Sequence, residues 1–307
     1  MTDRTYRTYS PLDRVVFIYL GIISGIALAG APWPMAWVFA GFHALAAILV
    51  ILAVRAEAAF GGAFWRAVRW WYPMLLIPSA FREMHWLVPL VHPFDDFRFD
   101  ALLKAWDLRI FGVDSGWLTE RIGHPVLTDV LTLCYASYYF LPILLGLSLY
   151  ARGLTKEFET GMTAITASFL LSYLGYIAVP ALGPYYFLSG YEVHPALQGV
   201  VVAGPVRDLL KSLEWTMPDA FPSGHTMVTL VTLHYAWRHA RRLTCLLIPV
   251  GGGLIVATLY LRYHYWMDVA AGVGLTAGVL LAMRLTGLSS PPRHQDTKDT
   301  KDTKTGR

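Results

Sequence analysis

Long apolar stretches alternate with short polar ones along most of this chain. Spanning the hydrocarbon core of a bilayer as a helix takes roughly 20 mostly apolar residues. Eight stretches are candidates, at about 15–31, 35–54, 71–91, 127–150, 161–180, 223–238, 243–261 and 266–285. The sixth stretch is short, but it can continue to Arg242. The pattern therefore predicts an all-α membrane protein with eight transmembrane helices.

The chain divides into three predicted parts. Residues 1–69 hold two N-terminal spans, residues 70–288 a six-helix catalytic core, and residues 289–307 a polar, repetitive tail that we expect to be disordered and cytoplasmic. Within the core, residues 97–111 carry apolar side chains at helical spacing, which predicts an interfacial helix. Residues 181–221 read as a long loop, and loops of that length are often functional.

Composition agrees with a membrane protein and excludes an ordinary soluble domain. The 307 residues are 55% hydrophobic and only 15% charged, and the mean hydropathy is +0.46. Cys134 and Cys245 both lie in apolar stretches, which argues against a disulfide framework and gives no support to a metal site. We therefore expect no cofactor and no metal, and membrane lipids rather than nucleic acid as partners.

The distribution of basic residues sets the expected orientation. With both termini in the cytoplasm, most of the 25 Lys and Arg residues fall in cytoplasmic segments, while the outer segments carry mixed charge. This is the positive-inside pattern. It predicts a multi-pass protein of the plasma membrane with the starts of the sixth and eighth spans at the non-cytoplasmic face.

Phe-Pro-Ser-Gly-His at 221–225 opens the sixth span, and its chemistry suits phosphate. The first N–H groups of a helix have no partner within the helix and carry partial positive charge, so they attract anions. Gly224 permits close approach of an anion to the backbone, Ser223 offers a hydroxyl, and His225 can donate a proton to a leaving oxygen. The structural alternative is a helix N-cap at Ser223 with His225 at the level of the lipid headgroups.

His264 and Asp268 form a second pair, 39 positions after the first histidine. The hairpin of the seventh and eighth spans brings His264 to the level of His225. An aspartate one helical turn after His264 can accept a hydrogen bond from its ring, fixing the tautomer. The alternative is an interfacial histidine in an aromatic belt, but that leaves unexplained a carboxylate inside a span, where such groups usually mark function.

These two motifs resemble the second and third signatures of the type-2 phosphatidic acid phosphatase superfamily, over roughly residues 70–285. The resemblance implies a six-helix core and a metal-free reaction through a phosphohistidine. It also implies a role for each motif residue: the nucleophile His264, its partner Asp268, the general acid His225, and the phosphate ligands Ser223 and Gly224.

The cationic residues of the family pattern are displaced in this chain. The first signature, a Lys six residues before Arg-Pro, is absent where the fifth span ends near Tyr185, which we keep as a substrate-binding candidate. Thr258 occupies the place of the family's arginine, and Arg262, one turn closer to His264, is the candidate phosphate clamp. Arg207 and Lys211 are candidate replacements for the missing cations; simple solvation or headgroup contact explains them equally well.

Two segments resemble the inositol phosphorylceramide synthase and sphingomyelin synthase branch: the sequence Tyr-Leu-Arg-Tyr-His-Tyr around His264, and Asp-Leu-Arg-Ile-Phe-Gly at 107–112. That branch implies transfer of a phosphorylated headgroup to an acceptor lipid. Arg82 and Glu83, inside the third span, either line the substrate cavity or make structural contacts between helices. The expectation is thus a lipid phosphotransferase; the alternatives are a lipid phosphate phosphatase and a non-catalytic lipid-binding bundle.

Overall fold

A computed structural model describes residues 9–92, 98–187, 194–213 and 218–288. Those residues form helices joined by turns and loops, and no strand occurs among them. The long helices are α1 (Pro11–Gly30), α2 (Met35–Phe60), α4 (Pro73–Val91), α9 (Thr155–Ala178), α12 (Gly224–His239), α13 (Arg241–Tyr260) and α14 (Trp266–Leu285). The shorter ones are α3 (Gly62–Trp71), α5 (Arg98–Trp106), η2 (Asp107–Phe111), α6 (Trp117–Ile122), α7 (Pro125–Ala136), α8 (Phe140–Ala151), α10 (Pro184–Phe187), η3 (Pro195–Gln198) and α11 (Ala203–Leu213).

Five helices are long and apolar enough to cross a membrane: α1, α2, α9, α13 and α14. The bent pair α7 and α8 supplies a sixth if it is taken as one span. The predicted third and sixth spans correspond to α4 and to α12, which has 16 residues, but neither is among these candidates. The protein is therefore an all-helical, multi-pass type, and the count of eight spans remains a prediction.

The predicted fourth span, 127–150, is not one continuous helix. It is divided into α7 and α8, whose axes differ by 49°. Ser137 closes α7 by donating from its hydroxyl to the carbonyl of Cys134, at 2.6 Å. Pro142, near the start of α8, has no N–H to continue a helical ladder backwards. Apolar length alone cannot reveal such a break.

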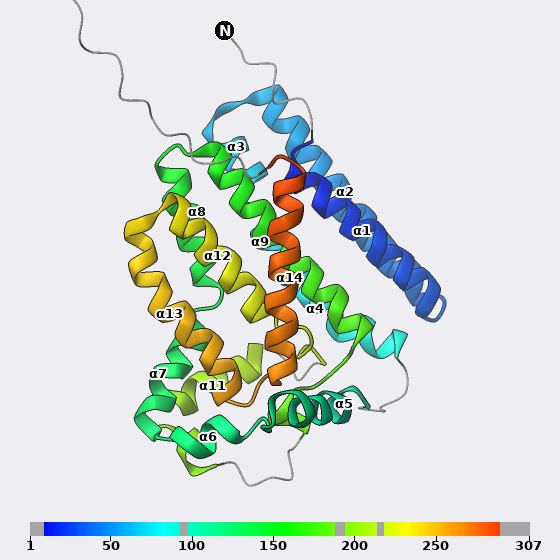
Figure 1. The fold of residues 1–307 in the computed structure, drawn as a ribbon. Coiled ribbons are helices and arrows are strands. Elements are labelled where there is room, and N and C mark those ends of the chain that lie inside the picture. Colours follow the sequence, from blue (N-terminus) through cyan, green and yellow to red (C-terminus); the bar gives the residue numbers. More distant parts are fainter. Residues whose placement is uncertain (1–8, 93–97, 188–193, 214–217, 289–307) are drawn as a thin grey trace, which may run out of the picture.

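Helix α9 forms the centre of the bundle and packs against α1, α4 and α12 (Figure 1). The N-terminal helices α1 and α2 lie side by side along one flank (Figure 1). Arg69 of α3 joins them at one end, with Nη2 2.8 Å from Asp13 Oδ2 and Nη1 2.9 Å from Glu57 Oε2. All three side chains are buried. The two N-terminal spans are therefore fastened to each other and packed on the core.

The other end of the bundle, which we call the histidine end, carries the starts of α12 and α14. Helices α5, α6 and α11 gather there (Figure 1). The predicted interfacial helix is α5 continued by the π-helical turn η2. The predicted loop 181–221 is not a plain loop, because it contains α10, η3 and α11. Tail residues 289–307 lie outside the described residues.

Candidate active site

The start of α12 is built around Ser223. Its side-chain oxygen accepts from the backbone N–H of Thr226 at 3.2 Å and from the Thr226 hydroxyl at 3.0 Å, as an N-cap does. Glycine fits tightly at the next position, because a Cβ on Gly224 would lie 2.7 Å from Tyr176 Oη and force that buried side chain to move. The Ser223 N–H donates to the Asp268 carbonyl at 3.1 Å. The starts of α12 and α14 are thus joined directly through the backbone.

The turn between α13 and α14 presents His264. The N–H groups of Tyr263 and His264 both donate to the carbonyl of Thr258, at 3.0 and 3.1 Å. Arg262 makes this turn possible by adopting φ = 63°, a left-handed conformation that is uncommon for a residue other than glycine. The resulting position leaves His264 only 3% exposed.

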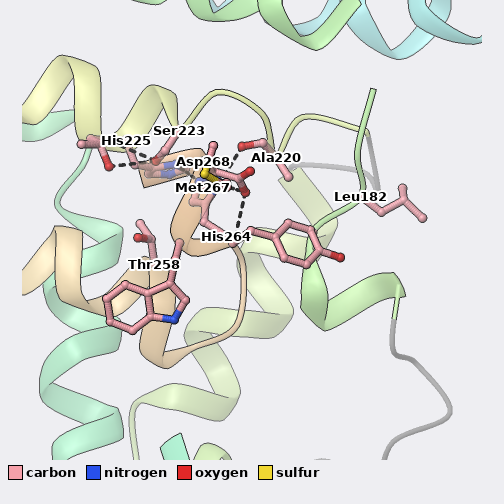
Figure 2. A network of polar contacts seen from close by, with 12 residues as sticks. Leu182, Ala220, Ser223, His225, Thr258, His264, Met267 and Asp268 are labelled. Carbon is pink, nitrogen blue, oxygen red and sulfur yellow. Dashed lines mark hydrogen bonds and ion pairs between the residues drawn. The ribbon is translucent and has the colours of Figure 1, made fainter. Parts of the chain in front are cut away.

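The His264 ring is oriented by two acceptors at one nitrogen. Nδ1 lies 2.8 Å from the Ala220 carbonyl oxygen and 3.3 Å from Asp268 Oδ2 (Figure 2). Both neighbours are acceptors, so Nδ1 carries the proton and Nε2 keeps its lone pair. Asp268 is itself held, since its Oδ2 accepts from the Tyr265 N–H at 2.7 Å. The ring of His264 is thus held in one orientation with one nitrogen unprotonated.

The free nitrogen of His264 faces the second histidine. His264 Nε2 lies 3.2 Å from His225 Nδ1, so the His225 N–H donates to it. The His225 ring is fixed between two aromatic side chains of the α7–α8 bend: Tyr135 at 4.7 Å between ring centroids and Tyr138 at 4.2 Å. The structure therefore brings His225, His264 and Asp268 together, with a proton donor pointed at the lone pair.

A recess adjoins this pair of histidines. Tyr135, which stacks on His225, also packs against Tyr263 at 4.9 Å, and both rings face the recess. The candidates Tyr185 and Arg207 both line it. Lys211 belongs to α11, but its side chain lies outside the described residues. The recess thus combines aromatic walls with Arg207, and it reaches the histidines through Tyr135, since neither histidine lines it.

The side chain of Arg262 is directed toward α6. Its Nη2 lies 3.8 Å from Glu120 Oε1, and a Cβ added to Gly116 would meet the same nitrogen at 3.2 Å. Arg262 Nε is buried and has no hydrogen-bond partner among the described residues. Arg262 precedes His264 by only two residues, but its guanidinium is directed at Glu120 and not at the histidine pair.

The two candidates from the third span differ in their surroundings. Glu83 Oε1 lies 2.6 Å from His43 Nε2, and His43 Nδ1 lies 2.9 Å from Ser24 Oγ. These three residues form a chain of polar contacts between α4, α2 and α1, as in the structural alternative considered above. Arg82 is exposed on α4.

One carboxylate beside the site was missed by sequence reasoning. Asp219 directly precedes Ala220, whose carbonyl holds His264. Burial raises the pKa of Asp219 to about 6, and the charge of the nearby His264 opposes that rise. The available signal was an acidic residue four positions before Ser223, in a segment that we interpreted only as loop. Tyr135 and Tyr138 were missed too, because nothing in the sequence placed the α7–α8 bend against His225.

The fold and the site define an all-helical membrane protein with two facing histidines at one end of its bundle. Residues 103–282 match the model of the PAP2 superfamily, and the chain belongs to that superfamily. Membership suggests a lipid phosphatase or phosphotransferase, since members act on lipid phosphates.

A curated relative agrees with this assignment. The chain is similar to a PA-phosphatase related-family protein of Dictyostelium discoideum, with 26% identity over 224 residues. The similarity covers 58% of this chain and 39% of the relative, so the chain spans about two fifths of that protein's length. No solved structure matches this chain.

Proposed function

We propose that this protein is an integral membrane phosphotransferase or phosphatase that acts on lipid phosphates at the outer leaflet, through a phosphohistidine on His264. The single observation that carries the proposal is the contact of 3.2 Å between His264 Nε2 and His225 Nδ1, with the opposite nitrogen of His264 held by Asp268 and Ala220. The two rings lie at one site, His264 with the attacking lone pair and His225 with a proton. A bound phosphate takes the place of the direct contact between the rings, which frees the lone pair for attack.

In the first half-reaction, His264 Nε2 attacks the phosphorus of the lipid phosphate. A nitrogen–phosphorus bond forms as the phosphorus–oxygen bond to the leaving alkoxide breaks. His225 enters this step as an imidazolium, gives that alkoxide a proton and is left neutral. Asp268 and the Ala220 carbonyl stabilise the positive charge that develops on His264. In the second half-reaction, an acceptor hydroxyl loses its proton to His225 and attacks phosphorus, which releases His264.

Charge on the phosphoryl oxygens needs positive partners. The backbone N–H groups at the start of α12, next to Ser223 and Gly224, supply partial positive charge. Arg207 lines the recess, and we assign it the role of the absent first-signature cation, assisted by Lys211 of the same helix. Arg262 serves this role only if its side chain turns away from Glu120.

Headgroup transfer is the version of this chemistry that we favour. Water competes with a lipid or polyol acceptor for the same intermediate, and a site that excludes water favours the acceptor. The aromatic walls beside His225, and the helices α5, α6 and α11 gathered at this end of the bundle, support such exclusion. Simple hydrolysis of phosphatidic acid or a prenyl diphosphate is the alternative.

Product analysis on detergent-purified protein tests the proposal. Phosphatidic acid, prenyl diphosphate and phosphatidylinositol are supplied separately, each with and without ceramide or diacylglycerol, and lipids and free phosphate are followed. A new phosphorylated lipid without free phosphate is expected; free phosphate alone would identify a phosphatase.

Both activities should vanish in His264→Ala and persist in His234→Ala, a histidine farther along α12 that has no place in the proposed mechanism. Full activity of His264→Ala would overturn the proposal. Binding of phospholipid without any turnover by the wild-type protein would favour the non-catalytic alternative.

A further inference from the structure

The first turn of α14 is capped by a residue far away in the sequence. Asp107 of η2 accepts hydrogen bonds from the backbone N–H groups of Trp266 at 3.0 Å and Met267 at 2.9 Å. The side chain of Asp107 is fully buried. These donors have no partner within their own helix, so a carboxylate placed there stabilises the helix start. A residue of the predicted interfacial segment therefore caps α14 together with the local contact between Asp268 and the Tyr265 N–H.

A second buried carboxylate of the same segment holds the other side of the catalytic turn. Asp100 of α5 accepts from the Tyr265 hydroxyl at 3.0 Å and from the N–H groups of Leu182 and Gly183, at 2.9 and 3.0 Å. Tyr265 directly follows His264 and is fully buried. Asp100 and Asp107 thus reach the residues on the C-terminal side of His264 from one surface segment.

We propose that Asp107 and Asp100 are positioning residues that hold the turn between His264 and Asp268 in its reactive geometry. The inference rests on the proposed function of His264. Trp266 and Met267, whose N–H groups Asp107 binds, lie between His264 and Asp268 in the chain. Because Asp268 is only 3.3 Å from His264 Nδ1, a small displacement of this turn separates the two side chains. Asp107 acts through the backbone and never touches the substrate.

Asp107 and Asp100 also connect the turn after His264 to a segment at the surface of the protein. Trp106 and Leu108 flank Asp107 and are 39% and 51% exposed, as expected of a segment in contact with the membrane interface. The carboxylates point inward while their apolar neighbours point outward.

Two variants of Asp107 in the full-length protein separate positioning from a merely structural role. Asp107→Asn keeps one acceptor oxygen for one of the two N–H groups and turns a donor NH2 toward the other, so kcat should fall about 10-fold. Asp107→Ala removes the acceptor and should lower kcat roughly 100-fold with little change in KM, as loss of an orienting partner does. Arg109→Gln, an exposed residue of the same segment, is the matched control.

Hydrogen–deuterium exchange of the peptide containing Trp266 and Met267 measures how well Asp107 holds these two N–H groups. The measurement needs no substrate. The amides should exchange faster in Asp107→Ala than in wild type or Arg109→Gln, with Asp107→Asn between these limits. Unchanged exchange in Asp107→Ala would overturn the proposal, even for a preparation that turns over no lipid. Faster exchange with kcat within twofold of wild type would also contradict it, because the turn would then move without consequence for the chemistry.

Discussion

At the scale of single residues, the site depends on which nitrogen of each histidine carries a proton. Two acceptors fix the proton of His264 on Nδ1, and stacking between Tyr135 and Tyr138 fixes the plane of His225. Both effects come from the protein itself and do not require a bound substrate. Local packing thus orients the two rings, and in the proposed mechanism this orientation lowers the barrier to attack.

Replacing His225 tests its assignment as the general acid. His225→Asn should lower kcat about 10²- to 10⁴-fold on a lipid phosphate with an alkoxide leaving group. A substrate with a nitrophenolate leaving group needs no proton, so the same variant should lose far less activity on it. Parallel assays of both substrates, with His234→Asn as control, measure the difference. Equal losses on the two substrates would show that His225 does not protonate the leaving group.

The pH dependence of stability should change when Asp219 is replaced. Its pKa is raised to about 6 in the folded protein, from 3.8, mainly by burial. The folded state therefore holds an extra proton between these values, and the resulting stabilisation is complete below about pH 4 and lost as the pH rises through about 6.

Asp219→Asn has no such proton, so near pH 7 it should be more stable relative to wild type than at pH 4, by roughly 1–3 kcal/mol. Thermal unfolding of both proteins in detergent across this pH range gives the comparison. Parallel stability curves would contradict the assignment of a raised pKa to Asp219.

The contacts of site residues could be predicted from the sequence where both residues belong to one local motif. They could not be predicted where the two residues are far apart in the chain. The sequence predicted that His264 and Asp268 lie close, and they lie 3.3 Å apart, but His264 stands in the turn before α14 and not on one helical turn with Asp268. Glu83 contacts His43, and Asp107 contacts the start of α14. Both partners are distant in sequence. Only packing brings such partners together, and periodicity contains no information about it.

At the scale of helices, two kinds of element escaped the hydrophobic pattern. Apolar length predicted one span over 127–150, while the structure has a bend of 49° that carries Tyr135 and Tyr138 to His225. Low apolar content over 181–221 predicted a loop, while α11 forms there and supplies Arg207. Short helices at the histidine end owe their stability to caps and tertiary contacts, which the pattern does not report.

The fastening of the N-terminal helices should depend on Arg69. Arg69→Met leaves Asp13 and Glu57 buried without their shared cation, which should destabilise the protein by about 3–5 kcal/mol. Arg66→Met, on the exposed face of α3, should have little effect. Unfolding of both variants in the same detergent measures this. Equal stability of the two variants would mean that the buried network contributes nothing to folding.

At the scale of the whole molecule, orientation in the membrane decides which lipids reach the histidines. We expect the histidine end at the non-cytoplasmic face, from the distribution of basic residues. Ser212 of α11 is exposed at that end. Thr155, the exposed first residue of α9, lies between Arg152 and Lys156 in a basic segment that this orientation places in the cytoplasm.

Single cysteines at these two positions test the orientation, in a background with Cys134 and Cys245 replaced by alanine. A membrane-impermeant maleimide added to intact cells should label Ser212→Cys at once and Thr155→Cys only after permeabilisation. The reverse pattern would place the proposed reaction on the cytoplasmic leaflet.

The most direct test of the account is the covalent state of His264 during turnover. Wild-type protein is mixed with a donor lipid, quenched in base, which preserves phosphohistidine, and analysed by peptide mass spectrometry. The account predicts an adduct on His264 that His264→Ala lacks; its mass separates a bare phosphoryl group, expected of a phosphatase, from a phosphorylated headgroup, expected of a transferase. Turnover that persists in His264→Ala, with no adduct on the wild-type histidine, would contradict the central claim.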